Sequence, residues 1–212
     1  MPTQNIKQML KEYGYPFKSK EHAQKLSCYQ HSGYGKTVLN YLGKGTKERF
    51  LCPDKLKYNF TPDFLIKVSD KCCKKLKKEV ADNWSKDNKR NITMTGMRKE
   101  EGGLRQSMTG CTVFTDTSMK NLKKFHPLLP VNEDFITWYI ESREIKLCNL
   151  YYPPYNFKRT GCKGCPFSLD LQVQLDVMEK FFPIEKKQCE IIWQPVYEEY
   201  RRIGYRLRKK FE

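Results

Sequence analysis

Long apolar segments and histidines are scarce in this 212-residue sequence. No window holds the roughly 18 apolar residues that a membrane-spanning helix needs, so no span is expected. The three histidines, His22, His31 and His126, stand in no Ser/His/Asp spacing, so no hydrolytic triad is recognisable. There is no internal repeat or low-complexity linker, and apolar residues occur throughout the chain. We therefore expect a globular protein.

Acidic residues are also few. The chain has 24 aspartates and glutamates and 40 lysines and arginines, which gives a formal charge of +16. Such an excess favours anionic partners such as nucleic acid, nucleotides, phosphate or sulfate groups. A lysine-rich surface that is simply solvated would give the same number, so charge alone names no ligand. The opening segment "MPTQNIKQMLKEYG" carries charges throughout and does not resemble a signal peptide. We therefore expect a cytoplasmic chain, in which nine clustered cysteines indicate metal binding or catalysis and not disulfides.

The first part of the chain alternates helical and irregular segments. Residues 3–13 have the spacing of a short amphipathic helix, and Ser19 is placed to cap a second helix through "KEHAQKLSCYQH". Residues 32–62 are rich in Gly, Pro, Lys and Tyr, which predicts an irregular insertion with one helical turn at "KTVLNYL". Residues 63–80 are predicted to form a helix that carries two adjacent cysteines.

The rest of the chain contains two segments with the composition of strands. Residues 90–98 hold β-branched residues that end at a glycine and predict a buried strand, and residues 111–117 predict a second. Asn132 is a candidate cap for a helix through "NEDFITWYIESREI", and residues 169–207 are helical with a break at Pro183. Few strands among several helices predict an α/β class, although the chain opens with helices and not with a βαβ unit.

Four cysteines form two close pairs. Cys72 and Cys73 are adjacent in "SDKCCKKLKKE", and Cys162 and Cys165 form a C-x-x-C 89 positions further on. A C-x-x-C lets one metal or cluster take both thiolates, and the glycines of "TGCKGCPF" allow backbone N–H groups to point at sulfur. Zinc and a [4Fe–4S] cluster both fit four thiolates, with adjacent cysteines awkward for tetrahedral zinc. A set of unligated thiols is the simpler alternative.

Four stretches, in order, resemble the phosphoadenosine phosphosulfate reductase family. They are "SDKCCKKLKKE", "ITMTGMRKEEGGLR", "HPLLPVNEDFITWYI" and "TGCKGCPF", and the resemblance covers about residues 60–170. It implies an α/β domain of the PP-loop, or adenine nucleotide alpha-hydrolase-like, fold, here incomplete, with few strands and a helix-rich C-terminal part. We expect one compact domain made of N-terminal helices and insertion (1–62), a reductase-like core (63–168) and a C-terminal helical extension (169–212).

The resemblance also implies the residues of a site. In cluster-containing relatives a Cys-Cys and a C-x-x-C hold one [4Fe–4S] cluster, so the implied ligands are Cys72, Cys73, Cys162 and Cys165, with zinc as the alternative metal. The resemblance further places three cations around the phosphate or sulfate of a nucleotide, where arginine suits bidentate hydrogen bonding. These are Lys77, Arg98 and Arg105.

Two departures from the family bear on catalysis. No "SGGKDS"-like PP-loop occurs, and "GYGKT", Gly33 to Thr37, is predicted to be a flexible turn because no strand precedes it. No cysteine follows Cys189, whereas sulfonucleotide reductases have a nucleophilic cysteine in an "ECGLH"-like tail. We therefore expect a truncated relative that is not catalytic alone, with a partner chain that supplies the PP-loop half. Self-association is common among relatives.

Two other functions stay open. One is a phage- or mobile-element-encoded pseudoenzyme that inhibits or binds a nucleic-acid-processing complex of the defence or CRISPR type. The other is a metal-stapled basic module that binds nucleic acid directly, for which the tail "EEYRRIGYRLRKK" offers aromatic and cationic side chains. The same tail also fits an amphipathic helix packed on the domain.

Overall fold

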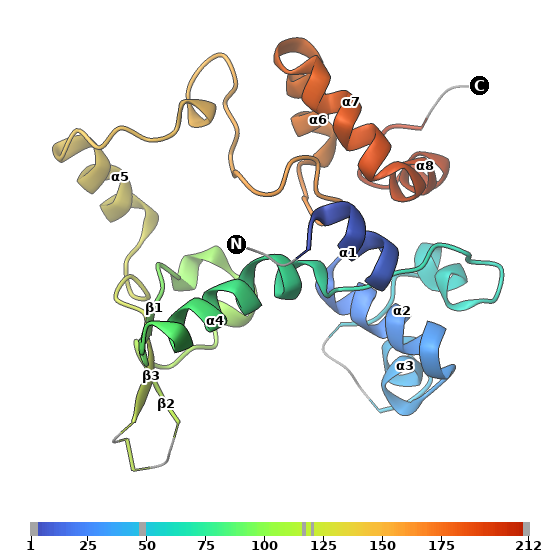
Figure 1. The fold of residues 1–212 in the computed structure, drawn as a ribbon, viewed down its shortest axis with the longest axis horizontal. Coiled ribbons are helices and arrows are strands. Elements are labelled where there is room, and N and C mark those ends of the chain that lie inside the picture. Colours follow the sequence, from blue (N-terminus) through green and yellow to red (C-terminus); the bar gives the residue numbers. More distant parts are fainter. Residues whose placement is uncertain (1–3, 47–49, 116–117, 120, 210–212) are drawn as a thin grey trace. The chain divides into compact units, whose positions relative to one another are not determined.

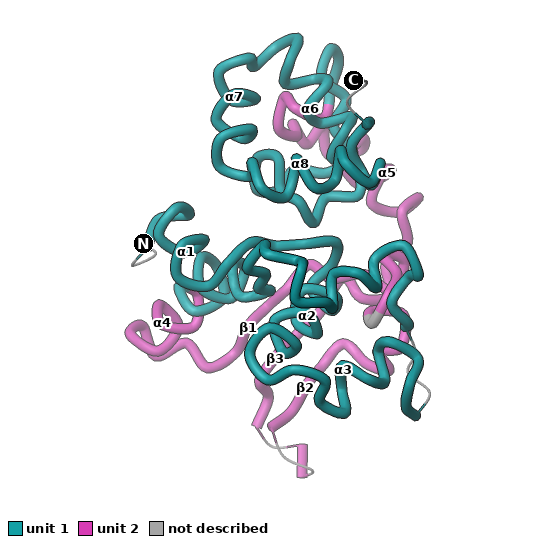
Figure 2. Tube along the Cα trace, turned by 90° about the vertical axis from the view of Figure 1, so that its right-hand side faces the viewer, with its two compact units in different colours: residues 1–80, 152–212 teal, residues 81–151 magenta. Residues whose placement is uncertain are grey.

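The computed structural model describes residues 4–46, 50–115, 118–119 and 121–209. The chain divides into two compact units, which Figure 2 distinguishes. Unit 1 comprises residues 1–80 and 152–212, and unit 2 comprises residues 81–151. Within the described part of the chain, no helix is long and apolar enough to cross a membrane. The division into 1–62, 63–168 and 169–212 stays a prediction.

Unit 1 is built from helices, and local sequence signals determine where several of them begin (Figure 1). The side chain of Ser19 accepts a hydrogen bond from the His22 amide at 3.2 Å, which confirms the predicted cap. Pro183 is the first residue of its helix, which confirms the predicted break. The helices are α1 (Ile6–Tyr13), α2 (Lys20–Ser32), α3 (Lys36–Tyr41), the 3₁₀ helix η1 (Asp54–Phe60), α6 (Leu171–Phe181), α7 (Pro183–Ile192) and α8 (Gln194–Ile203).

One core joins the two ends of the chain within unit 1. Side chains from α1, α2 and η1 lie in the same buried cluster as side chains from α6 and α8, more than a hundred residues away in sequence. The fully buried members include Met9, Phe17, Leu26, Leu56, Leu175 and Tyr197. Burial of this apolar surface, at about 25 cal/mol per Å², is the main stabilising contribution to unit 1.

The helix predicted over residues 63–80 is wrong in its first half. Residues 64–67 have no regular secondary structure, and Val68 pairs with Tyr15 through a parallel β-bridge. The Tyr15 amide donates to the Lys67 oxygen at 2.8 Å, so backbone groups of this segment are used outside any helix. Gly14, at φ +104°, permits the close approach, because an added Cβ would lie 2.5 Å from the Lys67 oxygen. Helix begins only at Cys72 and continues as a π-helical turn, η2 (Lys74–Lys78), into α4 (Glu79–Asp87).

Unit 2 holds a small mixed sheet, which makes the chain α/β as expected. The strand order is β1-β3-β2, with β1 parallel and β2 antiparallel to β3. The strands are β1 (Thr93–Met94), β2 (Thr112–Phe114) and β3 (Leu122–Phe125). The other elements are α5 (Glu133–Ser142), the 3₁₀ turns η3 (Lys99–Glu101), η4 (Gly103–Arg105) and η5 (Asn149–Tyr151), and most of α4. Asn132 caps α5 as predicted, since its side chain accepts from the Phe135 amide at 2.9 Å.

The buried strand predicted over residues 90–98 is present only as a two-residue exposed strand. Met94 is 68% exposed, and among the described residues of unit 2 only His126 and Leu129 are buried. β-Branched residues indicate extended backbone, but burial depends on partners elsewhere in the chain, which a local pattern does not report. The second predicted strand, 111–117, is β2, and its residues 116–117 lie outside the described residues.

Candidate metal centre

Cys72 and Cys73 begin the helix formed by η2 and α4. The Ser69 hydroxyl accepts a hydrogen bond from the Lys71 amide at 3.1 Å and so fixes the backbone just before the pair. Cys72 is buried and Cys73 half-buried, and their thiols hydrogen-bond to each other. That bond, together with burial, raises the pKa of Cys72. The bond from Cys72 lowers the pKa of Cys73, and the nearby ammonium groups of η2 act in the same direction.

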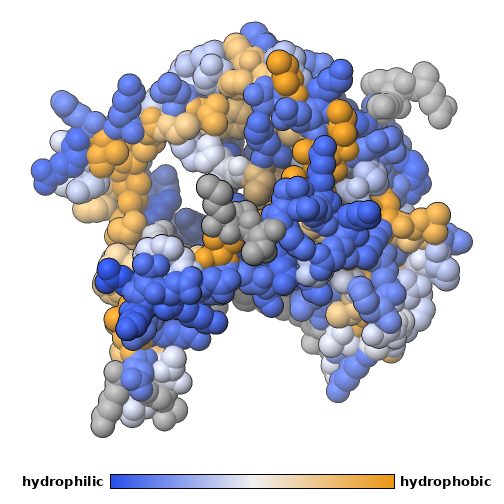
Figure 3. Space-filling model, viewed as in Figure 1, coloured by the Kyte–Doolittle hydropathy of each residue, from blue (hydrophilic) through white to orange (hydrophobic). Residues whose placement is uncertain are grey.

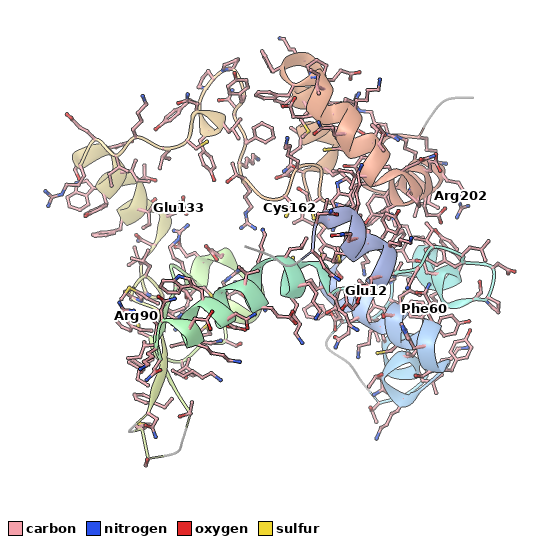
Figure 4. The ribbon with its side chains drawn as sticks, in the orientation of Figure 1. Glu12, Phe60, Arg90, Glu133, Cys162 and Arg202 are labelled. Carbon is pink, nitrogen blue, oxygen red and sulfur yellow. The ribbon has the colours of Figure 1, made fainter. Side chains whose placement is uncertain are left out.

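The second pair lies on a tight turn before α6, where Figure 4 labels Cys162. The Cys165 amide donates to the Cys162 oxygen at 3.1 Å and closes the turn. Gly164 adopts φ +56°, and a Cβ there would lie 2.9 Å from the Cys189 sulfur and would also collide with the Tyr197 hydroxyl. The turn therefore requires glycine at this position. Cys189 is buried beside it and packs as a small apolar side chain.

Side chains from the end of α7, from α8 and from the segment after α8 hold this turn by its carbonyl oxygens. We call these four donors the carbonyl clamp. They are Trp193 Nε1, which donates to the Lys163 oxygen (3.1 Å), Tyr197 Oη to the Gly164 oxygen, Tyr200 Oη to the Pro166 oxygen (3.1 Å) and Arg206 Nη1 to the Pro166 oxygen (2.5 Å). Each bond satisfies a backbone oxygen that has no partner in a helix or sheet.

Lys77 stands among the thiols of both pairs. Its ammonium group lies within electrostatic reach of Cys162, and also of Cys73 and Cys165. The negative charge available on Cys162 is the main reason that the pKa of Lys77 is raised. Cys165 also interacts electrostatically with Cys72 and with Cys73. The fold of unit 1 thus gathers two cysteine pairs, 89 positions apart in sequence, around one lysine.

The four thiols of the two cysteine pairs are ligands that soft metal ions prefer. Four thiols are the ligands of structural zinc and of iron–sulfur clusters. Within the part of the chain that is described, however, no three His, Cys, Asp or Glu side chains are arranged to hold a single metal ion. Thiolates bind a cubane cluster at its four corners, which stand further apart than four ligands of one ion. The residues present therefore fit a cluster in their chemistry, and their present spacing is not that of a zinc tetrahedron.

The other two predicted anion-binding residues lie in unit 2 and contact carboxylates. Arg98 makes an ion pair with Glu133 and lies 3.8 Å from Glu100, and its Nη1 atom is buried without a hydrogen bond. Arg105 pairs with Glu101 at 2.9 Å. These ion pairs were not anticipated from the sequence. Anion binding by Lys77, Arg98 and Arg105 stays a prediction.

The carbonyl clamp was not recognised in the sequence, although a signal exists. Trp193, Tyr197 and Tyr200 recur at helical spacing, each with an apolar body and a polar tip, which is the composition of a face that packs and donates. The arginines of the same tail mostly meet carboxylates: Arg201 bonds Glu190 at 2.8 and 2.5 Å, Arg202 bonds Glu199 at 2.7 and 2.8 Å, and Arg208 bonds Asp176 at 2.9 Å. The first part of the tail therefore belongs to the packed helix α8, which ends at Ile203, and the described arginines of the tail have internal partners.

The surface of η2 and α4 that faces the viewer in Figure 3 is largely hydrophilic. Lys75, on η2, pairs with Glu79 at 3.1 Å. Exposed pairs of this kind contribute little to stability, at most about 1 kcal/mol.

Comparison with known proteins gives one match. The family model described as "Phosphoadenosine phosphosulfate reductase domain" matches residues 47–168, which is more than half of the chain. The matched region contains both cysteine pairs, Lys77, Arg98 and Arg105. No curated protein matches the chain, and no solved structure does either.

Proposed function

Since this chain belongs to the phosphoadenosine phosphosulfate reductase family, we propose that its two cysteine pairs together hold one [4Fe–4S] cluster. The observation that carries the proposal is the convergence of both pairs on Lys77. Unrelated thiols spread over 89 positions would have no reason to share one cation. The proposed ligands are Cys72, Cys73, Cys162 and Cys165.

The local electrostatics support this assignment. Four thiolates bring a concentrated negative charge into a partly buried region, and the ammonium groups of Lys20, Lys77 and Lys78 lie near enough to Cys73 to offset it. When bound, a [4Fe–4S] cluster supplies a one-electron redox group and a covalent crosslink between two segments of the chain. Here the crosslink would join the start of η2 to the turn before α6.

We further propose that Lys77 binds the phosphate or sulfate of a nucleotide beside this site. The resemblance places this lysine at the anionic end of the ligand, and an ammonium group is a compact cation that suits such a role. The proposal is that this chain binds the nucleotide and does not catalyse its reduction alone. The residues that unit 1 brings together are the four thiols and Lys77, which suit binding. Lys77→Ala is expected to weaken binding of adenosine phosphosulfate at least tenfold in calorimetric titration. Lys71→Ala, whose ammonium group lies over the Tyr13 ring, is expected to leave it unchanged.

Substitution of a single ligand tests the cluster proposal. Cys162→Ser, purified without oxygen, is expected to lose most of its iron and to melt at a lower temperature, because metal binding stabilises only the folded state. Cys148→Ser is the matched control, since Cys148 is an exposed cysteine of unit 2. Equal iron content and equal melting temperatures in Cys162→Ser and the unsubstituted chain would refute the ligand assignment.

A further inference from the structure

Residues 67–78 of unit 1 carry a strong local excess of positive charge. They hold six lysines and a single acidic residue, Asp70. Lys71, Lys74 and Lys78 are exposed, and none of the three is in an ion pair with another residue that the structure describes. Their ammonium groups therefore face solvent without a carboxylate close enough to neutralise them.

The C-terminal tail is also basic in sequence, but most of its positive charge is used within the fold. Arg201, Arg202 and Arg208 each bond a carboxylate of unit 1, at distances from 2.5 to 2.9 Å. Arg206 donates to the Pro166 oxygen at 2.5 Å. The tail is therefore a weaker candidate for an anionic partner than its composition suggests, and residues 67–78 are a stronger one.

The ring of Tyr13, at the end of α1, brings two of these lysines together. The Nζ atom of Lys71 lies 5.2 Å from the ring centroid, and the Nζ atom of Lys75 lies 5.5 Å from it. Glu79 pairs with Lys75 at 3.1 Å, which leaves the Lys71 charge uncompensated. Two ammonium groups at one ring repel each other, so an anion that contacts both reduces this repulsion.

The composition of this surface suits the phosphodiester backbone of a nucleic acid. Lysine is a compact point charge that contacts phosphate oxygens without reading a base. No large apolar side chain is among the exposed ones between Leu65 and Trp84. A membrane anchor or the centre of a protein interface needs such side chains. The hydrophilic surface of η2 in Figure 3 agrees with this description.

We propose that Lys71, Lys74, Lys75 and Lys78, which we call the lysine face, bind the backbone of a nucleic-acid duplex independently of its sequence. A duplex presents phosphate charges at short, regular intervals, so several lysines of one segment are engaged at once. The inference goes beyond the proposed function and does not depend on it, because neither the cysteines nor Lys77 is part of the lysine face.

The test is the salt dependence of duplex binding by the full chain, measured by fluorescence anisotropy with two labelled DNA duplexes of unrelated sequence. The logarithm of the affinity should fall linearly with the logarithm of the salt concentration, by a slope of about 0.9 for each phosphate that is neutralised. Lys71→Ala combined with Lys74→Ala is therefore expected to reduce the slope by roughly two and to weaken binding at least tenfold at about 0.1 M salt. Both duplexes should behave alike.

Lys57→Ala combined with Lys186→Ala is the matched control. It removes the same charge from unit 1, but from lysines that already pair with Asp54 at 2.6 Å and with Glu179 at 2.8 Å. This variant is expected to keep the slope and the affinity of the unsubstituted chain. The substituted side chains of the test variant are exposed, so it is expected to fold like the control.

Three results would overturn the inference. They are equal slopes in the two double variants, failure of the unsubstituted chain to bind either duplex at about 50 mM salt, and tighter binding to polyglutamate than to the duplexes. The last result would assign the lysine face to an acidic protein. None of these measurements depends on iron, on sulfide or on adenosine phosphosulfate, so failure of the inference and failure of the proposed function are distinguishable.

Discussion

At the scale of single residues, His22 is the most strongly perturbed histidine of the chain. It is fully buried, and its Nδ1 lies 3.0 Å from the Tyr41 hydroxyl. Its ring packs against Phe17, Tyr41 and Phe60. Burial, aided by the charge of Lys18, lowers the pKa of His22 from 6.5 to about 3. The folded protein therefore keeps this histidine neutral where the unfolded chain would protonate it.

Because of His22, the free energy of unfolding should decrease as the pH is lowered. Below its unfolded pKa of 6.5 the unfolded state binds a proton that the folded state refuses until about 3, so stability is lost as the pH falls through this window. The loss approaches about 1.4 kcal/mol per pH unit from this one group. Urea unfolding at about pH 7, 6 and 5 measures it, and His22→Gln should flatten the dependence.

The control for this prediction is another histidine. His31→Gln replaces an exposed side chain and should leave the pH dependence as it is in the unsubstituted protein. If His22→Gln and the unsubstituted protein lose stability in parallel on acidification, His22 is protonated in the folded state and the assignment is wrong.

The cysteines and cations of the site could be predicted only in part from the sequence. The two cysteine pairs stand out in the sequence because close pairs of thiols are a local pattern. That the two pairs belong to one site was implied only by resemblance, since nothing local connects positions 72 and 162. The position of Lys77 near both pairs was not anticipated. The ion pair of Arg98 with Glu133 was missed because the two residues are 35 positions apart and no local pattern connects them. The pair of Arg105 with Glu101 is different, since the two residues are four positions apart and their spacing was a signal that could have been used.

At the scale of elements, the cysteine turn and α8 behave as one unit. The turn has no regular secondary structure, and the carbonyl clamp supplies the hydrogen bonds that a helix or sheet would otherwise provide. At Gly164 the turn approaches α8 so closely that an added Cβ would overlap the hydroxyl of Tyr197. A side chain at Gly164 would both strain the backbone and push α8 away from the turn.

Gly164→Ala should therefore destabilise the protein by about 2 kcal/mol or more, from the positive φ and the overlap with Tyr197 and Cys189. Gly161→Ala is the control on the same turn, since a Cβ there meets no atom within 4 Å. Thermal unfolding of the two variants measures the difference. Equal melting temperatures would show that the turn is free to move away from α8.

The sequence predicts elements well where their signals are local. Ser19, Asn132 and Pro183 start helices as expected, because a cap or a proline acts on its own backbone. The sequence does not predict an element correctly where contacts with a distant segment determine its structure. The segment before Cys72 is not helical, and its Val68 pairs with the distant Tyr15. The strand at Met94 is exposed because no buried apolar layer covers it among the described residues of unit 2.

At the scale of the whole molecule, the apolar core is unevenly distributed. The buried cluster belongs entirely to unit 1, whereas Leu129 is the sole buried apolar side chain among the described residues of unit 2. Units with few buried apolar contacts open at lower free energy than units with a core. The two units should therefore differ in local stability.

Hydrogen exchange should reveal this difference. Amides of α2 and α8 are expected to exchange at least a hundredfold more slowly than amides of β3 and α5, because opening the first pair disrupts the core of unit 1. Mass spectrometry of peptides after timed exchange measures the ratio. Equal protection in both units would mean that unit 2 is stabilised by contacts other than a buried core of its own.

The central claim is that the four thiols hold an iron–sulfur cluster. The most direct test is the iron, sulfide and zinc content of the anaerobically purified chain. We predict about four iron and four sulfide ions per chain, as a [4Fe–4S] cluster requires. Stoichiometric zinc without sulfide, or no metal at all, would contradict the claim.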